Sequence, residues 1–231
     1  MLRELVIERG YGRRFGVDDE HLAAFCAGLG SREELLRSCE VVILPKAVPA
    51  DLTQVREGSI LWGWFHCVQQ AELTQLAIDR RLTLIAFEAM YHWLEDGQRE
   101  LHSFHRNNEL AGHCAVHHAL RLSGLDGHFG PPHKAVVLSF GAVSRGAVHA
   151  LRGRGFHDLT VFTRRPPPRV RARIPGCRHR QMRRGKPGEA PALALVAEGS
   201  WRPLIGELEE ADLIVNGILQ DPNHPFMLMC S

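Results

Sequence analysis

The chain lacks the features that mark several classes of protein. Its longest apolar runs stay well short of the roughly 18 residues that a membrane-spanning helix needs, and its start, MLRELVIERG, has no apolar stretch of signal-peptide length. Its six cysteines form no CxxC pair. Charge of one sign is also missing, because 28 Lys and Arg face 26 Asp and Glu. We therefore expect a cytoplasmic protein with reduced thiols, no membrane partner and no global attraction to nucleic acid.

Aromatic residues are few, at 7% of the chain, whereas apolar residues in total make up 45%. With 231 residues the chain is long enough to bury one large core or two small ones. Apolar runs alternate with longer amphipathic stretches, which is typical of an α/β protein with largely parallel sheets. The pattern predicts strands over residues 5–7, 41–44, 59–65, 82–87, 135–138, 159–162, 193–196 and 212–216. It predicts helices over residues 18–28, 31–39, 71–80, 107–123, 143–151 and 201–209.

Two local signals refine this outline. Ser31 precedes a predicted helix and Glu34 follows three residues later, which is a capping-box pattern. The long helix over 107–123 is followed by Gly124 and then by the stretch GHFGPP. We place a domain boundary near residue 130, so that residues 1–130 form a first domain with this helix as a connector, and residues 131–231 form a second.

The stretch KAVVLSFGAVSRGAVHAL, from residue 134, predicts a strand, a tight turn and a helix. This is the context that a dinucleotide-binding turn needs, where small residues let the backbone approach a pyrophosphate. The residues in question are Ser139, Gly141, Ala142, Val143 and Ser144, and the helix-start N–H groups would face the phosphates. The alternative is an ordinary βα turn with no ligand.

The next predicted strand ends in Thr163, Arg164 and Arg165. NAD-binding folds usually carry an acid here, which binds the ribose 2′-hydroxyl, whereas arginine accommodates the 2′-phosphate of NADP. The sequence therefore favours NADP(H) as the cofactor. The alternative is that the two arginines simply begin a solvated loop, since residues 164–186 hold ten Lys and Arg and no acid.

Six segments in order, LPKAV, GWFHCVQ, LIAFEAM, FHRNNELAG, LSFGAVSRGA and IVNGILQDPNHPFM, resemble the alanine dehydrogenase/pyridine nucleotide transhydrogenase family. The N5-(carboxyethyl)ornithine synthases are the most similar branch, and saccharopine dehydrogenases are more distant. The resemblance implies two Rossmann-like parallel-sheet domains and NADPH-dependent reductive condensation of a small 2-oxo acid, such as pyruvate, with an amino acid's amine. Two alternatives remain open, a simple alanine dehydrogenase-like enzyme and a non-catalytic relative that binds NADP(H) or a partner chain.

The resemblance also implies site residues. Lys46 in LPKAV and His66 in GWFHCVQ match a lysine and a histidine that serve the substrate in the family. A cation stabilises the oxo acid's carboxylate, and a group that titrates near neutral pH moves protons. Glu88 ends the next strand and would orient a substrate amine or His66, or else act as a helix-start acid. Asn216, in VNGILQ, matches a loop that lies along the nicotinamide ribose in relatives.

Against this family pattern, the chain lacks the arginine segment that precedes the first matching strand, and it stops soon after VNGILQDP. We therefore expect a chain shortened at both ends, with an incomplete second domain. A parallel sheet without its far strands exposes an edge and apolar faces. The chain is thus either a fragment or a shortened relative that covers these surfaces as a homo-oligomer.

Two other patterns carry less weight. His113 and His117 stand at i and i+4 on the connector helix, a spacing that can place two imidazoles on one metal ion, but no HExxH motif accompanies them. We expect no metal site. The basic tract over residues 164–186 lacks the interleaved aromatics on which bases stack, and its prolines indicate a loop, so we do not expect nucleic-acid binding.

Overall fold

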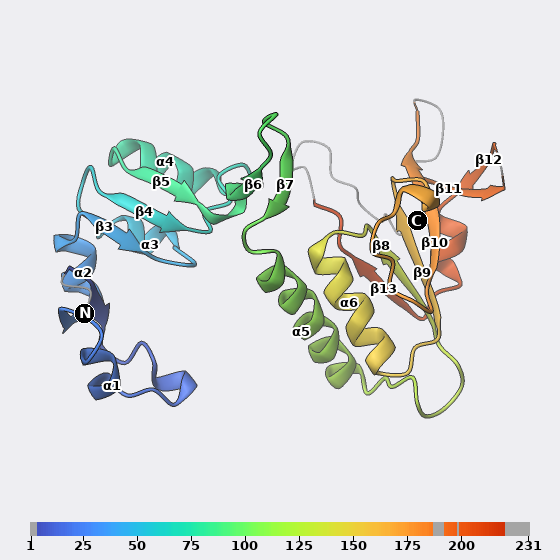
Figure 1. The fold of residues 1–231 in the computed structure, drawn as a ribbon, viewed down its shortest axis with the longest axis horizontal. Coiled ribbons are helices and arrows are strands. Elements are labelled where there is room, and N and C mark those ends of the chain that lie inside the picture. Colours follow the sequence, from blue (N-terminus) through green and yellow to red (C-terminus); the bar gives the residue numbers. More distant parts are fainter. Residues whose placement is uncertain (1–3, 187–191, 198, 220–231) are drawn as a thin grey trace. The chain divides into compact units, whose positions relative to one another are not determined.

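The computed structural model describes residues 4–186, 192–197 and 199–219 (Figure 1). The chain divides into two compact units between Ser103 and Phe104. Each unit is built from strands and helices with parallel pairing at its centre, which confirms the predicted α/β fold class. Among the helices in these ranges, none combines the length and the apolar character that crossing a bilayer requires.

The first unit begins with a small two-stranded sheet and continues into a three-stranded parallel sheet in the order β3-β4-β5. Its strands are β1 (Val6–Glu8), β2 (Gly28–Gly30), β3 (Val41–Ile43), β4 (Ile60–Gly63), β5 (Thr83–Ala86), β6 (Tyr91–Trp93) and β7 (Arg99–His102). Its helices are η1 (Arg13–Phe15), α1 (Asp19–Ala23), α2 (Arg32–Ser38), α3 (Pro49–Leu52), α4 (Ala71–Asp79) and the short η2 (Phe87–Ala89).

Strand alternation decides the core of the first unit. Val42, Leu61 and Leu84 point to one face of the three-stranded sheet and pack with apolar residues from α2, α3 and α4. Residues on the opposite face are more open, and Val41 and Ile43 remain 51% and 55% exposed. The helices of this unit therefore contribute to the core on one face of its parallel sheet.

The second unit carries a six-stranded sheet in the order β12-β11-β10-β9-β8-β13. Its strands are β8 (Lys134–Leu138), β9 (Asp158–Thr163), β10 (Arg178–Arg184), β11 (Ala192–Ala197), β12 (Ser200–Pro203) and β13 (Leu213–Asn216). Its helices are α5 (His105–Ser123), α6 (Ala142–Gly153), η3 (Pro167–Arg169) and α7 (Ile205–Glu209). Strands β10, β9, β8 and β13 are neighbours in that order and pair in parallel. Strands β11 and β12 extend the sheet beyond β10 with antiparallel pairing.

Both faces of this second sheet are covered. On one face, residues of α5 and α6 pack against Ala135, Val137, Leu159 and Val161. On the other face, Leu208 of α7 belongs to a cluster with strand residues of β8, β9 and β10. Figure 1 shows α5 and α6 next to each other on one side of this sheet.

The connector helix belongs with the second unit. The sequence placed it in the first domain, before a boundary near residue 130, but α5 packs closely on α6. Two glycines allow this approach, because a Cβ on Gly112 would lie 1.9 Å from the carbonyl oxygen of Val143, and one on Gly146 would lie 1.7 Å from that of Glu109. Backbone-to-backbone contact of this kind ties α5 to α6.

Local signals in the sequence were reliable. Ser31 accepts the N–H of Glu34 and Glu34 accepts the N–H of Ser31, which confirms the capping box. Gly124 ends α5 in the left-handed conformation, with φ of 67°. The strands expected around residues 41–44, 82–87, 135–138 and 159–162 are present with bounds shifted by a residue or two.

Three expectations were wrong. The helix expected over 18–28 ends at Ala23, because Gly28–Gly30 pairs with β1 as a parallel strand. The helix expected over 201–209 is strand β12 followed by the short α7, since Trp201 pairs with Leu195. The basic tract is a loop only at its start, because Arg178–Arg184 forms β10 beside β9.

Candidate functional site

The order of strands in the second unit places the glycine turn at a switch point of the sheet. Strand β8 lies between β9, which follows it in the chain, and β13, which pairs on its other side. Open α/β sheets bind ligands outside the carboxyl ends of the strands where the strand order reverses in this way. Since β8 ends at Leu138, the turn from Ser139 onward lies at this point.

The turn itself is tight on one side and open on the other. Ser139 has φ of 79°, and its N–H donates to the carbonyl oxygen of Phe162 at 2.7 Å. Gly141 is the N-cap of α6, and a Cβ built on it would meet no other atom within 4 Å. The first N–H groups of a helix have no partner in a preceding turn, and no acid lies in this first turn. The space beside Gly141 therefore suits an anionic group.

Ser144 and Asn216 lie against this turn. Ser144 is fully buried with its hydroxyl 3.5 Å from the carbonyl oxygen of Leu138, and a Cβ on Gly217 would lie 2.0 Å from that hydroxyl. Asn216 pairs with Leu138 in the sheet, and its Oδ1 accepts the N–H of Ile218 at 3.1 Å. Ser144 thus acts as a small packing residue, and the polar end of β13 adjoins the glycine turn.

The end of β9 brings arginine to the same turn. The Thr163 hydroxyl, which is buried, accepts the N–H of Arg165 at 3.4 Å. The Arg165 Nη2 then donates to the carbonyl oxygen of Phe140 at 3.1 Å, so its guanidinium lies on the turn. Arg164 is exposed, and its carbonyl accepts from Gln181 Nε2 at 3.0 Å. Within the described part of the chain, neither arginine forms an ion pair with a carboxylate.

In the first unit, Lys46, His66 and Glu88 follow three neighbouring parallel strands at the same sheet edge. Two hydrogen bonds link the loops that carry them. The backbone N–H of Trp64 donates to the carbonyl oxygen of Pro45 at 3.0 Å, and the backbone N–H of His66 donates to Glu88 Oε1 at 2.6 Å. The structure therefore brings His66 and Glu88 into contact and places the exposed Lys46 in the loop adjoining Trp64.

His66 is held in an unusual position. Its φ is 49°, and its ring stacks on Trp64 with centroids 5.9 Å apart. Trp64 also stacks with His102, which belongs to the β6–β7 hairpin, at 5.8 Å. Glu88 Oε2 is buried, and within the described residues it has no hydrogen-bond partner. No pattern in the sequence indicates this aromatic stack, because the β6–β7 hairpin is what brings His102 to Trp64.

The paired histidines of α5 contact each other and Arg154. His113 Nε2 and His117 Nε2 are 3.0 Å apart, and Arg154 Nε donates to His117 Nδ1 at 3.2 Å. Burial, followed by the charges of His113 and Arg154, lowers the pKa of His117. Metal-bound histidines usually donate from their second nitrogen, whereas His117 accepts there. Over the described ranges no three His, Cys, Asp or Glu side chains gather as metal ligands.

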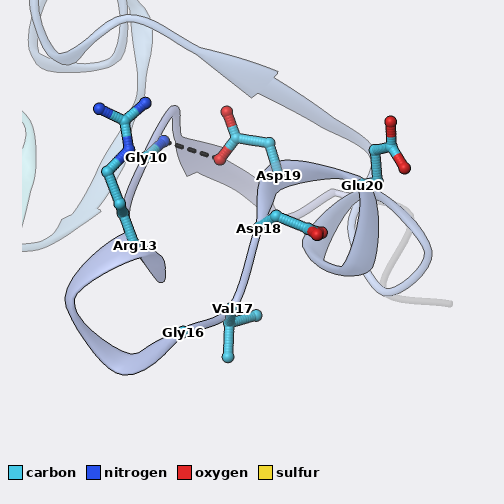
Figure 2. A pocket seen from close by; sticks show the side chains of 7 residues that line it. All are labelled: Gly10, Arg13, Gly16, Val17, Asp18, Asp19 and Glu20. Atoms are coloured by element: carbon cyan, nitrogen blue, oxygen red, sulfur yellow. Dashed lines mark hydrogen bonds between the residues drawn. The ribbon is translucent and has the colours of Figure 1, made fainter.

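A hollow of about 530 Å³ lies elsewhere in the first unit (Figure 2). Its lining comes from one loop and the start of α1, namely Gly10, Arg13, Gly16, Val17, Asp18, Asp19 and Glu20. Asp19 Oδ1 accepts the N–H of Gly10 at 2.7 Å, and Asp18 Oδ1 accepts the N–H of His21, which lowers the pKa of Asp18. These carboxylates cap local backbone, and no predicted site residue lines the hollow.

Comparison with known proteins identifies the first half of the chain. Residues 3–111 match the family model of the alanine dehydrogenase/PNT N-terminal domain. The match covers Lys46, His66 and Glu88 and extends into α5, so the resemblance noted from the sequence motifs is confirmed.

The curated relatives that the chain resembles include proteins with two different names. An N(5)-(carboxyethyl)ornithine synthase from Clostridium botulinum is 25% identical over 236 residues, which cover 95% of this chain and 61% of the relative. An alanine dehydrogenase from Methanococcus maripaludis is 26% identical over 115 residues, or 49% of this chain and 30% of the relative. The chain thus spans about three fifths or less of the length of these relatives.

Solved structures agree on the fold. A transhydrogenase from Sinorhizobium meliloti superposes with a TM-score of 0.64 at 16% identity, covering 94% of this chain and 61% of that one. An L-alanine dehydrogenase gives a TM-score of 0.54 at 22% identity, with 76% and 52% covered. At these identities the likeness concerns the fold alone, and it supports a Rossmann-like architecture for this chain.

Proposed function

We propose that this protein is an NADPH-dependent oxidoreductase acting on CH–NH bonds. In this proposal a small 2-oxo acid such as pyruvate condenses with the amine of an amino acid, and the new carbon–nitrogen bond is reduced. The main support is the match to a carboxyethylornithine synthase along 95% of the chain, together with the clustering of the motif residues at one sheet edge.

The substrate would bind in the first unit, at the carboxyl ends of β3, β4 and β5. The Lys46 ammonium would hold the carboxylate of the oxo acid and stabilise negative charge that develops on its carbonyl oxygen. The His66 imidazole would move protons as the amine adds and water leaves. Glu88 would position the loop that carries His66, since its carboxylate accepts the backbone N–H of His66 at 2.6 Å.

The cofactor would bind in the second unit, at the switch point of its sheet. When bound, NADPH supplies the hydride. The open space at Gly141 and the N–H groups of Ala142, Val143 and Ser144 suit the pyrophosphate. Ser139 and Asn216 border this space, while Thr163, Arg164 and Arg165 would receive the ribose end. The preference for NADP(H) over NAD(H) rests on these two arginines.

The first experiment is a calorimetric titration of the purified chain with NADPH and, separately, with NADH. We expect tighter binding of NADPH and loss of that preference in Arg165→Ala. Arg184→Ala, which removes one exposed arginine of the same basic tract, is the matched control. A folded, monodisperse sample that binds neither nucleotide would refute the dehydrogenase proposal.

The second experiment follows NADPH oxidation with pyruvate and a panel of amino acids, or with ammonia. Turnover that requires an amino acid would support the condensation, and turnover with ammonia alone would indicate an alanine dehydrogenase-like reaction. Lys46→Ala and His66→Ala should each abolish turnover and leave nucleotide affinity unchanged. Nucleotide binding without turnover on any pair would indicate a non-catalytic binding protein.

The cytoplasmic location stays a prediction.

A further inference from the structure

The imidazole of His66 belongs to a group of aromatic rings in the first unit. The Trp64 indole lies nearly parallel to the His66 imidazole, with the two planes 21° apart, and to the His102 imidazole, with the planes 15° apart. The buried ring of Phe87 meets Trp64 edge-on, with centroids 5.8 Å apart. Aromatic pairs in offset-stacked and edge-to-face arrangements attract each other beyond the area that they bury. Trp64 therefore connects His66 with the β6–β7 hairpin.

The backbone around Trp64 is fixed at the sheet edge. A Cβ on Gly63 would lie 2.0 Å from the carbonyl oxygen of Leu44, so the end of β4 approaches the end of β3 closely. The backbone N–H of Trp64 then donates to the carbonyl oxygen of Pro45 at 3.0 Å. The indole therefore projects from a constrained segment, and this segment is bonded to the loop that carries Lys46.

The hairpin holds His102 through the pairing of its two strands. Tyr91 of β6 lies opposite His102 of β7, and the two rings meet edge-on with centroids 4.9 Å apart. The Arg99 guanidinium lies over the Tyr91 ring at 4.9 Å and over the Trp93 ring at 5.4 Å. Cross-strand aromatic pairs stabilise a hairpin, and a cation over an aromatic face adds to this stabilisation. The position of His102 therefore depends on the register of β6 with β7.

The backbone of His66 does not by itself fix the imidazole. Its φ of 49° and its N–H bond to Glu88 determine where the Cβ lies. Rotation about the Cα–Cβ and Cβ–Cγ bonds can still move the ring nitrogens, and the residue is exposed, so no surrounding core restricts this rotation. Contact with the Trp64 face does restrict it. This matters for catalysis because a displacement of about 1 Å can cost on the order of 10²-fold in rate.

We propose that Trp64 and His102 are positioning residues for the His66 imidazole, so that the β6–β7 hairpin orients the group that would move protons. This inference rests on the proposed function and adds to it two residues that act through His66. The substrates would meet an imidazole that is already oriented, which lowers the cost of reaching the reactive arrangement. Because the Trp64 backbone also holds the Lys46 loop, one residue would keep both substrate-binding groups in register.

The test compares three substitutions in the hairpin. His102→Ala removes the ring, and His102→Phe keeps a flat ring without the imidazole nitrogens. His92→Ala removes an exposed histidine of the same hairpin and is the matched control. We expect His102→Ala to lower kcat for NADPH oxidation about three- to ten-fold, as the loss of one aromatic contact implies, with the KM for NADPH unchanged. His102→Phe and His92→Ala should each stay within about two-fold of the wild type.

Proton NMR of the His66 ring gives a second measurement that does not need turnover. An indole stacked on the imidazole shifts the imidazole's C–H signals through its ring current, and His66→Gln identifies these signals by their loss. At constant pH they should move toward the position of a free imidazole in His102→Ala and stay near the wild-type position in His102→Phe. His102→Leu, which keeps apolar volume without a ring, replaces His102→Ala if that variant does not fold.

Unchanged His66 signals and an unchanged kcat in His102→Ala would overturn the positioning role. A loss in His102→Phe as large as that in His102→Ala would also overturn it, because an imidazole nitrogen and not the stacked ring would then be required. A wild-type protein that oxidises NADPH with none of the substrates would instead defeat the proposed function. In that case the NMR signals would still test the position of the ring, so the two failures are distinguishable.

Discussion

At the scale of single residues, the two candidate sites share one property. Ser139 and His66 each follow a parallel strand, and each has positive φ, 79° and 49° respectively. Residues with side chains rarely adopt this conformation, and when they do, the surrounding structure holds them there. Ser139 is held by Phe162, and His66 is held by Glu88 and Trp64. The strain therefore lies where the family motifs predict ligand contact.

Replacing Ser139 by glycine tests the cost of this conformation. The left-handed conformation costs a residue with a Cβ roughly 1–2 kcal/mol, and glycine avoids this cost. Glycine also makes the unfolded chain more flexible, which offsets part of the gain in stability. We expect Ser139→Gly to raise the free energy of unfolding of the second unit by about 0.5–1 kcal/mol. Urea denaturation would measure it. Ser123→Gly, at the end of α5, is the control and should lower stability; a loss in both variants would contradict the argument.

At the scale of elements, the packing of α5 on α6 organises the second unit. Gly112 and Gly146 allow backbone contact between the helices, so neither position tolerates a side chain. The same pair of helices carries the His113–His117–Arg154 contacts at its other end. Helix α6 therefore has its start at the candidate nucleotide turn and its side fixed by α5.

Alanine substitutions along α6 should have opposite effects. A Cβ at Gly146 would lie 1.7 Å from a backbone oxygen of α5, whereas one at Gly153 would meet nothing within 4 Å. Gly146→Ala should lower the free energy of unfolding by about 1–3 kcal/mol. Gly153→Ala, the matched control, should raise it by about 0.5–1 kcal/mol because alanine favours a helix. Chemical denaturation reports both, and a stabilised Gly146→Ala protein would disprove the close packing.

The contacts of His117 predict a dependence on pH. Its pKa in the folded protein lies below the ordinary 6.5, so the unfolded chain binds the proton more readily. The contribution of His117 to the free energy of unfolding should therefore be fully present above pH 6.5 and should decrease as the pH falls below it. His117→Gln, which keeps an acceptor for Arg154, should flatten this slope. It should not abolish it, because the pKa of His179 is lowered too.

Denaturation series from pH 7.5 to pH 5.5 would measure this slope, with His118→Gln as the control on the same helix. His113 and Arg154 contact His117 directly, and Asp126 pairs with Arg154 at 3.6 Å. Ionic strength should be held constant because salt screens the interactions between these charges. An unchanged slope in His117→Gln would show that other groups set the acid sensitivity.

At the scale of the whole molecule, one face of the first unit's parallel sheet stays partly exposed among the residues that the structure describes. Register places Val41 beside Ile60, and Ile43 beside Trp62 and Ile85. Val41, Ile43 and Ile85 are 51%, 55% and 39% exposed. Parallel sheets are normally covered on both faces. The homo-oligomer expected from the sequence stays a prediction, and this face is where a second copy would bind.

Placing a charge on this face tests that prediction. Ile43→Lys should reduce concentration-dependent self-association, because a lysine would be buried in the contact. Sedimentation velocity over a hundred-fold concentration range would measure it. Ile78→Lys, on α4 and 65% exposed, is the matched control and should associate like the wild type. A wild-type protein that remains monomeric throughout would exclude the homo-oligomer.

The sequence alone determined the local parts of this protein. The strand–turn–helix at Ser139 to Ser144, the capping box at Ser31 and the end of α5 at Gly124 depend on residues a few positions apart. For the same reason the family motifs could be recognised and are confirmed over residues 3–111. The roles of Lys46 and His66 stay predictions, although the structure places their loops at one sheet edge.

Only the tertiary structure decided which distant residues meet. Arg145, Arg165 and His179 meet at Phe140 from α6, from the end of β9 and from β10, which no local pattern indicates. The grouping of α5 with the second unit likewise depends on contacts between Gly112, Gly146 and backbone far away in the chain. The spacing of side chains along the sequence predicts helices and strands, because these form from residues that are close together in the chain. The convergence of cations depends on packing between elements, which one sequence does not encode in any short pattern.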